Sequence, residues 1–310
     1  MIRPTGSWLA WQQLLRAGNA PTAASNVAAG FLLSRSDWQP IGLLLTLVAA
    51  SILLYESGMV LNDVFDSDVD ERERPERPIP SGRIRRQDAM AVGWSLLAGG
   101  VLCSGLASWM AGGVGPAIVA SCLAATVVMY NGGLKATWAG PLAMGWCRTL
   151  NVLLGGSASP ALGADWELWW YAAAIGVYTA GLTIYAQAEQ AEQSAAVRTR
   201  GEKVTGLGLM MVLPLLMLPR ALRTSSPIGG DWTAWVCAWL ALTGAYAASL
   251  YRARITGTTA GYRQHVSAVI VGFLLLDALI SWAAAGRMAG LAVLALILPI
   301  LLGARRAPMT

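Results

Sequence analysis

The chain has 310 residues, of which 55% are hydrophobic and only 13% are charged. Soluble domains carry about 25% charged residues, so this composition excludes an ordinary soluble globular protein. The single histidine, His265, excludes a multi-histidine metal site, and the four cysteines lack the paired spacing of a zinc or redox motif. We expect the net charge of +5 to face anionic lipid headgroups rather than nucleic acid.

Long apolar runs separated by short polar stretches predict an all-α, polytopic transmembrane bundle of nine or ten helices. Each run is close to the ~20 residues with which a helix crosses the hydrocarbon core, where backbone polar groups must be paired within the segment. In chain order, we predict spans near residues 19–35, 41–61, 88–111, 114–131, 140–159, 166–187, 204–220, 231–250, 265–285 and 288–304. No linker divides these runs, so we expect one domain over 1–310, with cap loops at about 62–87 and 188–203.

The distribution of basic residues predicts the orientation of the bundle. If both termini are cytoplasmic, 17 of the 22 Lys and Arg residues lie on the cytoplasmic side and four on the other, with Arg148 inside a span. Basic residues near helix ends stay cytoplasmic. We therefore expect a multi-pass integral membrane protein whose longest polar loop, 62–87, faces the cytoplasm.

The first acidic cluster ends the second predicted span and holds an asparagine and four aspartates in the nine residues 62–70. Asn62, Asp66 and Asp70 recur every four residues, so on a continuing helix they would form one oxygen-lined stripe, with Asp63 beside it. Closely packed carboxylates repel one another unless a cation neutralises them. Mg²⁺ is commonly bound by one or two carboxylates plus substrate phosphate, so the cluster indicates a Mg²⁺–diphosphate site. The alternative is that these aspartates only cap and end a helix.

Six arginines follow the acidic cluster within the fifteen residues 72–86. Guanidinium groups bind phosphate oxygens through paired N–H bonds, and we predict that Arg77 makes such a contact. Prolines in this stretch keep the chain from continuing as a helix. We interpret most of the other arginines as anchors on the cytoplasmic side.

The second acidic cluster ends the sixth predicted span. Tyr185, Glu189 and Glu192 follow one another at spacings of four and three residues, so they share a helix face. The predicted topology puts this cluster on the same side of the membrane as the first, where the two could hold metal ions between them. The alternative is an ordinary solvated helix end.

The first cluster and its basic tail resemble the signature of the UbiA superfamily of membrane prenyltransferases. That signature, Asn-Asp-x-x-Asp-x-x-x-Asp followed by Arg-Pro-x-x-x-Gly, is matched by residues 62–70 and 77–82. The stretch from Tyr130 to Lys135 is similar to the family's Tyr-x-x-x-Leu-Lys loop. The second motif departs from the pattern, because Glu189 and Glu192 stand where the family commonly has aspartates and Ala188 replaces a lysine.

The resemblance implies a bundle around a central cavity, in which a prenyl group passes from an isoprenoid diphosphate to an acceptor. It implies Mg²⁺ as the cofactor, held by Asn62, Asp63, Asp66, Asp70, Glu189 and Glu192. Catalytic roles would fall to Asn62, Asp66, Asp70 and Glu189, and substrate contacts to Arg77, Tyr130, Lys135 and Tyr185. The acceptor stays open among phenolic or quinone precursors, chlorin or haem rings, glycerol phosphate-type lipids and small polar metabolites.

Polar residues inside the predicted spans are further candidates, because an ionisable group in a membrane helix is by default functional. We predict that Asn19, Asn26, Arg148 and Asn151 line the cavity and hold the acceptor or the diphosphate. The alternative is helix packing through polar side chains. We interpret Asp277 as structural, with a partner such as Arg252 or Arg148.

Two other readings compete with the prenyltransferase. A transporter would place charged residues near the bilayer midplane, commonly in two related halves. Here the acidic residues gather at one interface, and no internal repeat is found. A non-catalytic isoprenoid-binding scaffold is suggested only by the glutamates of the second motif.

Overall fold

The computed structural model describes residues 8–193, 232–256 and 259–299. All the secondary structure in these ranges is helical, which confirms the all-α prediction. The longer helices are α2 (Ala20–Arg35), α3 (Ile41–Phe65), α5 (Arg86–Ala111), α6 (Gly115–Asn131), α7 (Gly140–Gly156), α8 (Trp166–Gln193), α10 (Trp232–Thr256) and α11 (Thr259–Ala285). The shorter ones are α1 (Trp8–Leu15), α4 (Ser67–Glu73), α12 (Arg287–Leu294) and the 3-10 turns η1 (Ala17–Asn19) and η2 (Leu134–Ala136).

The long helices coincide with the predicted spans, although α10 continues to Thr256 rather than to residue 250 and α11 begins at Thr259 rather than at residue 265. Two further differences have a local cause. Helix α8 continues past residue 187 to Gln193, because the sequence there is rich in Ala, Gln and Glu, which favour helix after the apolar run ends. The last predicted span, 288–304, is interrupted after Leu294. The ring of Pro299 is incompatible with a helical carbonyl four residues earlier, at Ala295, which explains the break. The span predicted near 204–220 lies outside the described residues.

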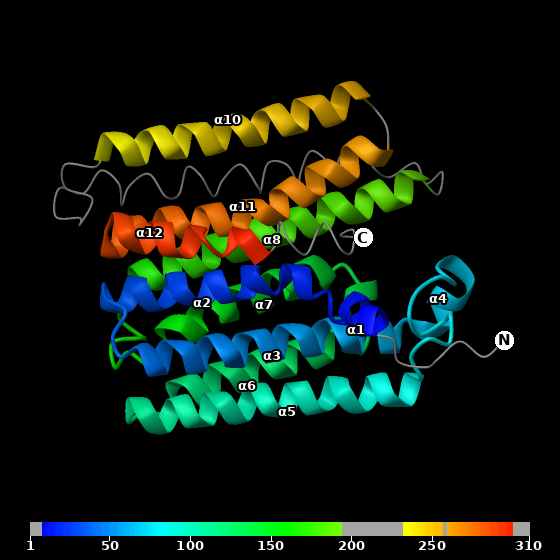
Figure 1. Cartoon of the computed structure of the whole chain (residues 1–310), viewed down its shortest axis with the longest axis horizontal. Coiled ribbons are helices and arrows are strands. Elements are labelled where there is room, and N and C mark those ends of the chain that lie inside the picture. The colour runs from blue at the N-terminus through cyan, green and yellow to red at the C-terminus, as the bar shows by residue number, and fades with distance from the viewer. Residues whose placement is uncertain (1–7, 194–231, 257–258, 300–310) are drawn as a thin grey trace.

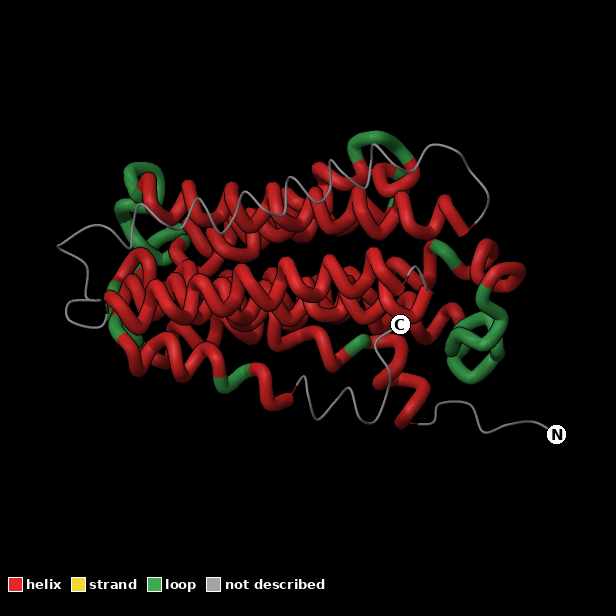
Figure 2. The backbone as a smooth tube through the Cα atoms, turned by 90° about the horizontal axis from the view of Figure 1, so that it is seen from above, coloured by secondary structure: helices red, strands yellow, loops and turns green. Residues whose placement is uncertain are grey.

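The helices run lengthwise in a bundle, with α10 along one side and α5 along the other (Figure 1). Helix α3 contacts α5, α2 and α6, while α7 joins α2 to α8. Seen from above, the long helices lie side by side along the same axis (Figure 2). Helices α3, α6 and α8 run in the same direction, so their ends lie at the same end of the bundle as α4 (Figure 1).

Glycines let the central helices approach closely. A Cβ atom on Gly155 of α7 would lie 2.1 Å from the carbonyl oxygen of Val27, and one on Gly30 of α2 would lie 2.0 Å from that of Val152. Such distances leave no room for a side chain. Helices α2 and α7 therefore pack with their backbones in direct contact at these glycines.

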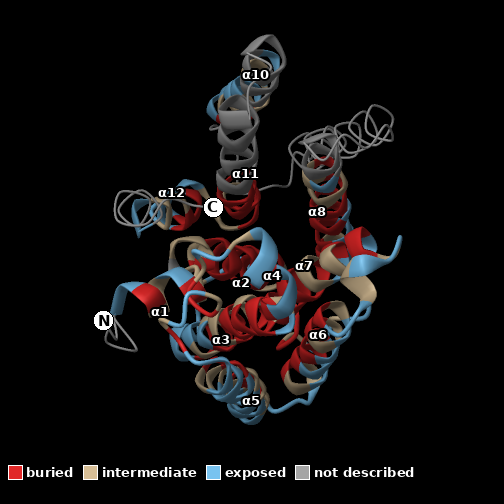
Figure 3. Ribbon diagram, turned by 90° about the vertical axis from the view of Figure 1, so that its right-hand side faces the viewer, coloured by how far each residue is buried: buried red, intermediate tan, exposed pale blue. Residues whose placement is uncertain are grey.

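Apolar residues also cover much of the outer surface. Helices α3 and α5 are long and apolar enough to cross a membrane, with mean hydropathies of 1.9 and 1.6, and α6 is a shorter apolar helix. In the end-on view, buried residues gather where α2, α3 and α7 face one another, whereas the outer side of α5 is exposed (Figure 3). Leu102 and Trp109 of α5 are 73% and 80% exposed. Large apolar side chains on an outer helix face suit contact with lipid.

Candidate functional site

The first acidic cluster lies at a break between two helices, at the end of the bundle. Helix α3 ends at Phe65 and α4 begins at Ser67, with Asp66 between them. The backbone N–H of Asp66 donates to the carbonyl of Asn62 at 3.0 Å, and that of Asp70 donates to Asp66 at 2.8 Å. The helical pattern of backbone hydrogen bonds therefore continues across the break, although the chain changes direction there.

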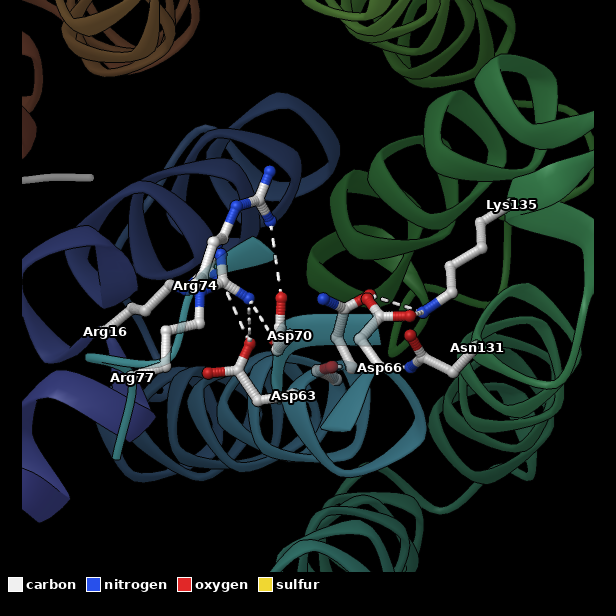
Figure 4. A network of polar contacts seen from close by, with 10 residues as sticks. Arg16, Asp63, Asp66, Asp70, Arg74, Arg77, Asn131 and Lys135 are labelled. Atoms are coloured by element: carbon white, nitrogen blue, oxygen red, sulfur yellow. Dashed lines mark hydrogen bonds and ion pairs between the residues drawn. The ribbon is translucent and has the colours of Figure 1, made fainter. Parts of the chain in front are cut away.

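The single stripe expected from Asn62, Asp66 and Asp70 is wrong, because the break divides it. The oxygens of Asn62 and Asp66 face Lys135 (Figure 4). Asp70 instead joins Asp63, and both accept hydrogen bonds from Arg77. The four-residue spacing assumed one continuous helix, which ends before Asp66.

Arginines surround the group formed by Asp63 and Asp70. Nη1 of Arg77 lies 3.3 Å from Asp63 and 2.7 Å from Asp70, and Arg16 lies 3.2 Å from Asp63. Arg74 adds a longer contact of 3.6 Å to Asp70. Both carboxylates are buried, so these guanidinium groups supply the neutralising charge that the cluster needs. The predicted contact of Arg77 with phosphate remains a prediction.

Lys135 occupies the other half of the cluster. Its Nζ lies 2.6 Å from Asp66 and 3.1 Å from Oδ1 of Asn62. The 3-10 turn that carries Lys135 follows Gly133, whose φ of 148° favours glycine. The α6–α7 connection thus places its lysine on the end of α3.

Tyr130 and Asn131 end helix α6 just before this connection. Tyr130 is half-buried, and its predicted substrate contact is not tested by the structure. Asn131 is buried, and its Nδ2 donates to the carbonyl of Gly58 at 3.3 Å. Its Oδ1 has no hydrogen-bond partner within the described part of the chain. Asn131 is not among the residues predicted from the sequence, although it lies inside the stretch that resembles the family's Tyr-x-x-x-Leu-Lys loop.

The segment between α4 and α5 forms an ordered cap rather than a free loop. Ile79 and Ile84 are buried in a small apolar cluster with Ala10, Leu14, Val60, Val64 and Ala89. Arg83 fixes the segment further, donating to Gln13 at 2.7 Å and to the carbonyl of Glu76 at 2.6 Å. Gly82 closes the turn with a φ of 72°, a conformation that L side chains rarely adopt. The packing of this cap on α1 and α3 fixes the backbone around Arg77.

The second acidic cluster lies on the last turns of α8. Tyr185 is buried, 1% exposed. The backbones of Glu189 and Glu192 belong to α8, but their side chains lie outside the described residues. Their predicted roles as metal ligands therefore remain predictions.

The described acidic residues do not complete a Mg²⁺ coordination shell by themselves, so the substrate would have to supply further ligands. No three His, Cys, Asp or Glu side chains in the described ranges lie close enough together to hold a metal ion. The oxygens of Asn62 and Asp66 converge on one cation, Lys135 Nζ, and a buried Asn131 oxygen is unpaired among the described residues. Mg²⁺ prefers oxygen ligands and usually needs one or two carboxylates, with phosphate and water completing its shell.

A second polar group lies deeper in the bundle, around Arg148 of α7. Its guanidinium donates to Oδ1 of Asn26 at 3.0 Å and to Thr22 at 3.1 Å. It also lies over the rings of Tyr55 and Phe273, at 5.5 and 5.0 Å from their centroids. Cations are attracted to aromatic faces at such distances.

Helix α3 connects this group to the acidic cluster. Tyr55 precedes Asn62 by seven residues, so both lie on nearly the same face of α3. At 1.5 Å per residue, the separation along the helix is about 10 Å. Arg148 therefore lies about two helical turns deeper than Lys135 and Asp66.

The other predicted cavity residues differ in their contacts. Asn151 is buried and bonded on both sides, accepting from Ser51 at 2.6 Å and donating to the carbonyl of Ala23 at 3.0 Å. These contacts favour the packing alternative for Asn151. Asn19 is half-buried, and its Oδ1 has no partner among the residues that the structure describes.

Asp277 of α11 accepts three hydrogen bonds instead of forming a direct pair with Arg148. Its carboxylate accepts from Ser25 at 2.5 Å, Asn26 at 2.7 Å and Tyr171 at 2.6 Å. The side chain of Arg252, the other partner considered, lies outside the described residues. Asn26 thus stands between the carboxylate and the guanidinium, a bridge that the sequence does not predict.

Comparison with known proteins agrees with this fold. A sequence model of the UbiA prenyltransferase family matches residues 23–260. The digeranylgeranylglyceryl phosphate synthase of Methanothrix thermoacetophila is 31% identical over 157 residues, 48% of this chain and 55% of the relative. The synthase of the same name from Sulfurisphaera tokodaii is 34% identical over 97 residues, 31% of this chain and 34% of the relative. The chain thus spans between a third and about half of these curated relatives' length.

Solved structures with the same fold cover nearly the whole chain. An apo UbiA homologue from Aeropyrum pernix aligns with a TM-score of 0.66 at 16% identity, covering 86% of this chain and 98% of its own. A structure from a study of digeranylgeranylglyceryl phosphate synthase in membranes aligns with a TM-score of 0.63 at 19% identity, covering 89% and 98%. At these identities the likeness concerns the fold alone. With the family match over residues 23–260, the chain belongs to the UbiA prenyltransferase family of membrane-embedded proteins.

Proposed function

We propose that this protein transfers a prenyl group from an isoprenoid diphosphate to an acceptor in the membrane, releasing diphosphate. In this reaction the allylic C–O bond breaks, the diphosphate leaves with the bonding electrons, and an acceptor atom bonds the allylic carbon and loses its proton. The observation that carries the proposal is the pairing of Lys135 with Asp66 and of Arg77 with Asp63 and Asp70 at one end of α3.

The paired cations suit a diphosphate site. Lys135 and Arg77 are each about one-fifth exposed, so a ligand can reach them from the end of the bundle. Phosphate oxygens can take the places of the carboxylates around Lys135 and Arg77, since both cations bind phosphate well. Mg²⁺ held by Asn62 and Asp66 would supply charge neutralisation for the leaving diphosphate. Asp63, Asp70, Glu189 and Glu192 complete the proposed set of metal ligands.

The chain's own residues would also bind the donor away from its diphosphate. Tyr130 and Tyr185 lie on helices that end at the same end of the bundle as α3, and we assign both to substrate contacts. The prenyl tail would lie among the apolar helices. Binding energy gained from the tail is remote from the reacting carbon and can hold it in position.

Arg148, Asn26 and Asn19 suit the acceptor. Arg148 and Asn26 lie deeper than the diphosphate site, and a guanidinium in an apolar surrounding binds anions strongly. The named relatives are synthases of digeranylgeranylglyceryl phosphate. We therefore propose a lipid of the glyceryl phosphate type as the acceptor class.

We further propose one domain over residues 1–310, with caps at about 62–87 and 188–203. The basic residues around the first cap favour its placement on the cytoplasmic side, with both termini there.

The proposal is tested by supplying purified protein with geranylgeranyl diphosphate, Mg²⁺ and a panel of acceptors. The panel contains a prenylated glyceryl phosphate, a phenolic acid and an acceptor-free control, and products are identified by mass spectrometry. We expect a product only with the glyceryl phosphate. A product only with the phenolic acid would overturn the acceptor class. Donor binding without any product would favour a non-catalytic isoprenoid-binding scaffold, and absence of donor binding would favour a transporter.

A further inference from the structure

We infer that Asp277, together with Tyr171, is a positioning residue that fixes the guanidinium of Arg148 through Asn26. The inference rests on the proposed function in one respect, because that proposal assigns Arg148 to substrate binding. The contacts themselves join five helices at one place, because Tyr55, Asn26, Arg148, Tyr171 and Asp277 come from α3, α2, α7, α8 and α11.

The side-chain amide of Asn26 has its orientation set from both sides. Its Nδ2 donates to Asp277 at 2.7 Å, and its Oδ1 accepts from Arg148 at 3.0 Å. Turning the amide over would set its NH₂ group against the guanidinium and its oxygen against the carboxylate. Both contacts would then be lost, so the carboxylate holds Asn26 as an acceptor for Arg148.

Asp277 is itself held in a fixed position. It is fully buried, and Ser25 and Tyr171 donate to it at 2.5 and 2.6 Å. Ser25 also lies beside Asn26 on α2, while Tyr171 reaches across from α8. A carboxylate with three donors has no freedom to move toward the guanidinium, since buried polar networks of this kind rigidify their surroundings.

The indirect arrangement leaves Arg148 available to a ligand. Within the described ranges, Arg148 forms no direct ion pair with a carboxylate. Its guanidinium carries more N–H groups than Asn26 and Thr22 accept. Asp277 therefore balances the buried positive charge of Arg148 without bonding to its N–H groups. A directly paired carboxylate would occupy those groups.

A double-mutant cycle separates positioning from simple stabilisation. We expect Asp277→Asn to lower kcat/KM for the acceptor about tenfold, in the range of coupling between contacting residues. In an Arg148→Gln background the same substitution should lower it no further. An equal loss in both backgrounds, or no loss in either, would overturn the inference. Tyr171→Phe removes one donor with little change of shape and serves the same cycle if Asp277→Asn does not fold.

Asp165 supplies the matched control. Its carboxylate also accepts from a serine of α2, Ser34 at 2.9 Å, and from the backbone N–H of Leu168 at 3.1 Å, far from Arg148. Asp165→Asn should lower the thermal midpoint without changing kcat/KM. A loss of kcat/KM in this variant equal to that of Asp277→Asn would overturn the inference, because the effect would then be general.

A structure of the Tyr171→Phe or Asp277→Asn variant tests the positioning of Arg148 without any measurement of activity. We expect the guanidinium of Arg148 to leave its place between Tyr55 and Phe273. If it keeps its contacts with Asn26 and Thr22, the inference is wrong. If the wild-type protein transfers no prenyl group, the proposed function fails, and this structural comparison still decides the positioning.

Discussion

Nζ of Lys135 lies 2.6 Å from Oδ1 of Asp66, although the two residues are 69 positions apart in the chain. This pair joins the α6–α7 connection to the end of α3, and Asn62 shares the same lysine. The lysine thus lies between the two oxygens that are proposed to hold Mg²⁺.

Replacement of the lysine should affect donor binding more than stability. We predict that Lys135→Gln raises KM for the isoprenoid diphosphate about tenfold or more, because a charge-assisted contact to phosphate is lost. The free energy of unfolding should change by at most about 1 kcal/mol, since the ion pair is partly exposed. Steady-state kinetics and thermal unfolding in detergent measure the two effects.

Arg86→Gln is the control for this variant. Arg86, at the start of α5, pairs with the exposed Asp68 of α4 at 3.0 Å. If Arg86→Gln raises KM as much as Lys135→Gln, the assignment of Lys135 to the diphosphate is wrong.

Arg77 should not be replaceable by lysine. We predict that Arg77→Lys lowers kcat/KM by roughly tenfold or more, because an ammonium group lacks the planar fork that serves several oxygens at once. Arg85→Lys should have no effect, because Arg85 is largely exposed and pairs with Asp88, away from the acidic cluster. Comparison of kcat/KM for both variants with the wild type tests this, and equal values for Arg77→Lys and the wild type would contradict it.

The metal requirement should depend on particular aspartates. We predict that chelation with EDTA abolishes prenyl transfer and that added Mg²⁺ restores it. Asp66→Asn should raise the Mg²⁺ concentration for half-maximal activity, because a neutral amide is a poorer ligand for a hard cation. Asp68→Asn should leave it unchanged, since Asp68 is exposed and faces Arg86. If the Mg²⁺ concentration for half-maximal activity shifts equally in the two variants, Asp66 is not a ligand of the metal.

The close contact of α2 with α7 should tolerate no side chain at Gly155. A Cβ there would meet the oxygen of Val27 at 2.1 Å and the nitrogen of Phe31 at 2.8 Å, both backbone atoms. We predict that Gly155→Ala destabilises the protein by roughly 1–3 kcal/mol, the usual cost of overpacking. Gly105→Ala on α5, where no atom lies within 4 Å of the added Cβ, should not destabilise it. A thermal midpoint of Gly155→Ala equal to that of Gly105→Ala would contradict the packing described.

The sequence predicts the long helices well because each of them coincides with an apolar run, whereas the short helices α1 and α4 lie outside the predicted spans. The differences occur where another preference acts, as at the polar end of α8 and before Pro299. A hydropathy pattern locates the apolar core of a helix, but helix formers and prolines decide where it ends.

The sequence predicts the members of the site but not their grouping. Residue spacing identifies Asp66 and Asp70 as neighbours on a helix. Because the helix breaks at Asp66, Asp66 instead contacts Lys135 and Asp70 contacts Arg77. The contact of Arg16 with Asp63 and the bridge through Asn26 join distant segments, so no local spacing indicates them. Asn131 could have been found, because it lies within a stretch already singled out.

The most direct test of the central claim is the release of pyrophosphate from geranylgeranyl diphosphate by the purified protein. It is measured with the acceptor present, with and without Mg²⁺, beside an Asp66→Ala variant. We predict release that requires both Mg²⁺ and Asp66. Release that is the same without Mg²⁺ or in Asp66→Ala would contradict the account of the site, and absence of release and of donor binding would contradict the proposed activity.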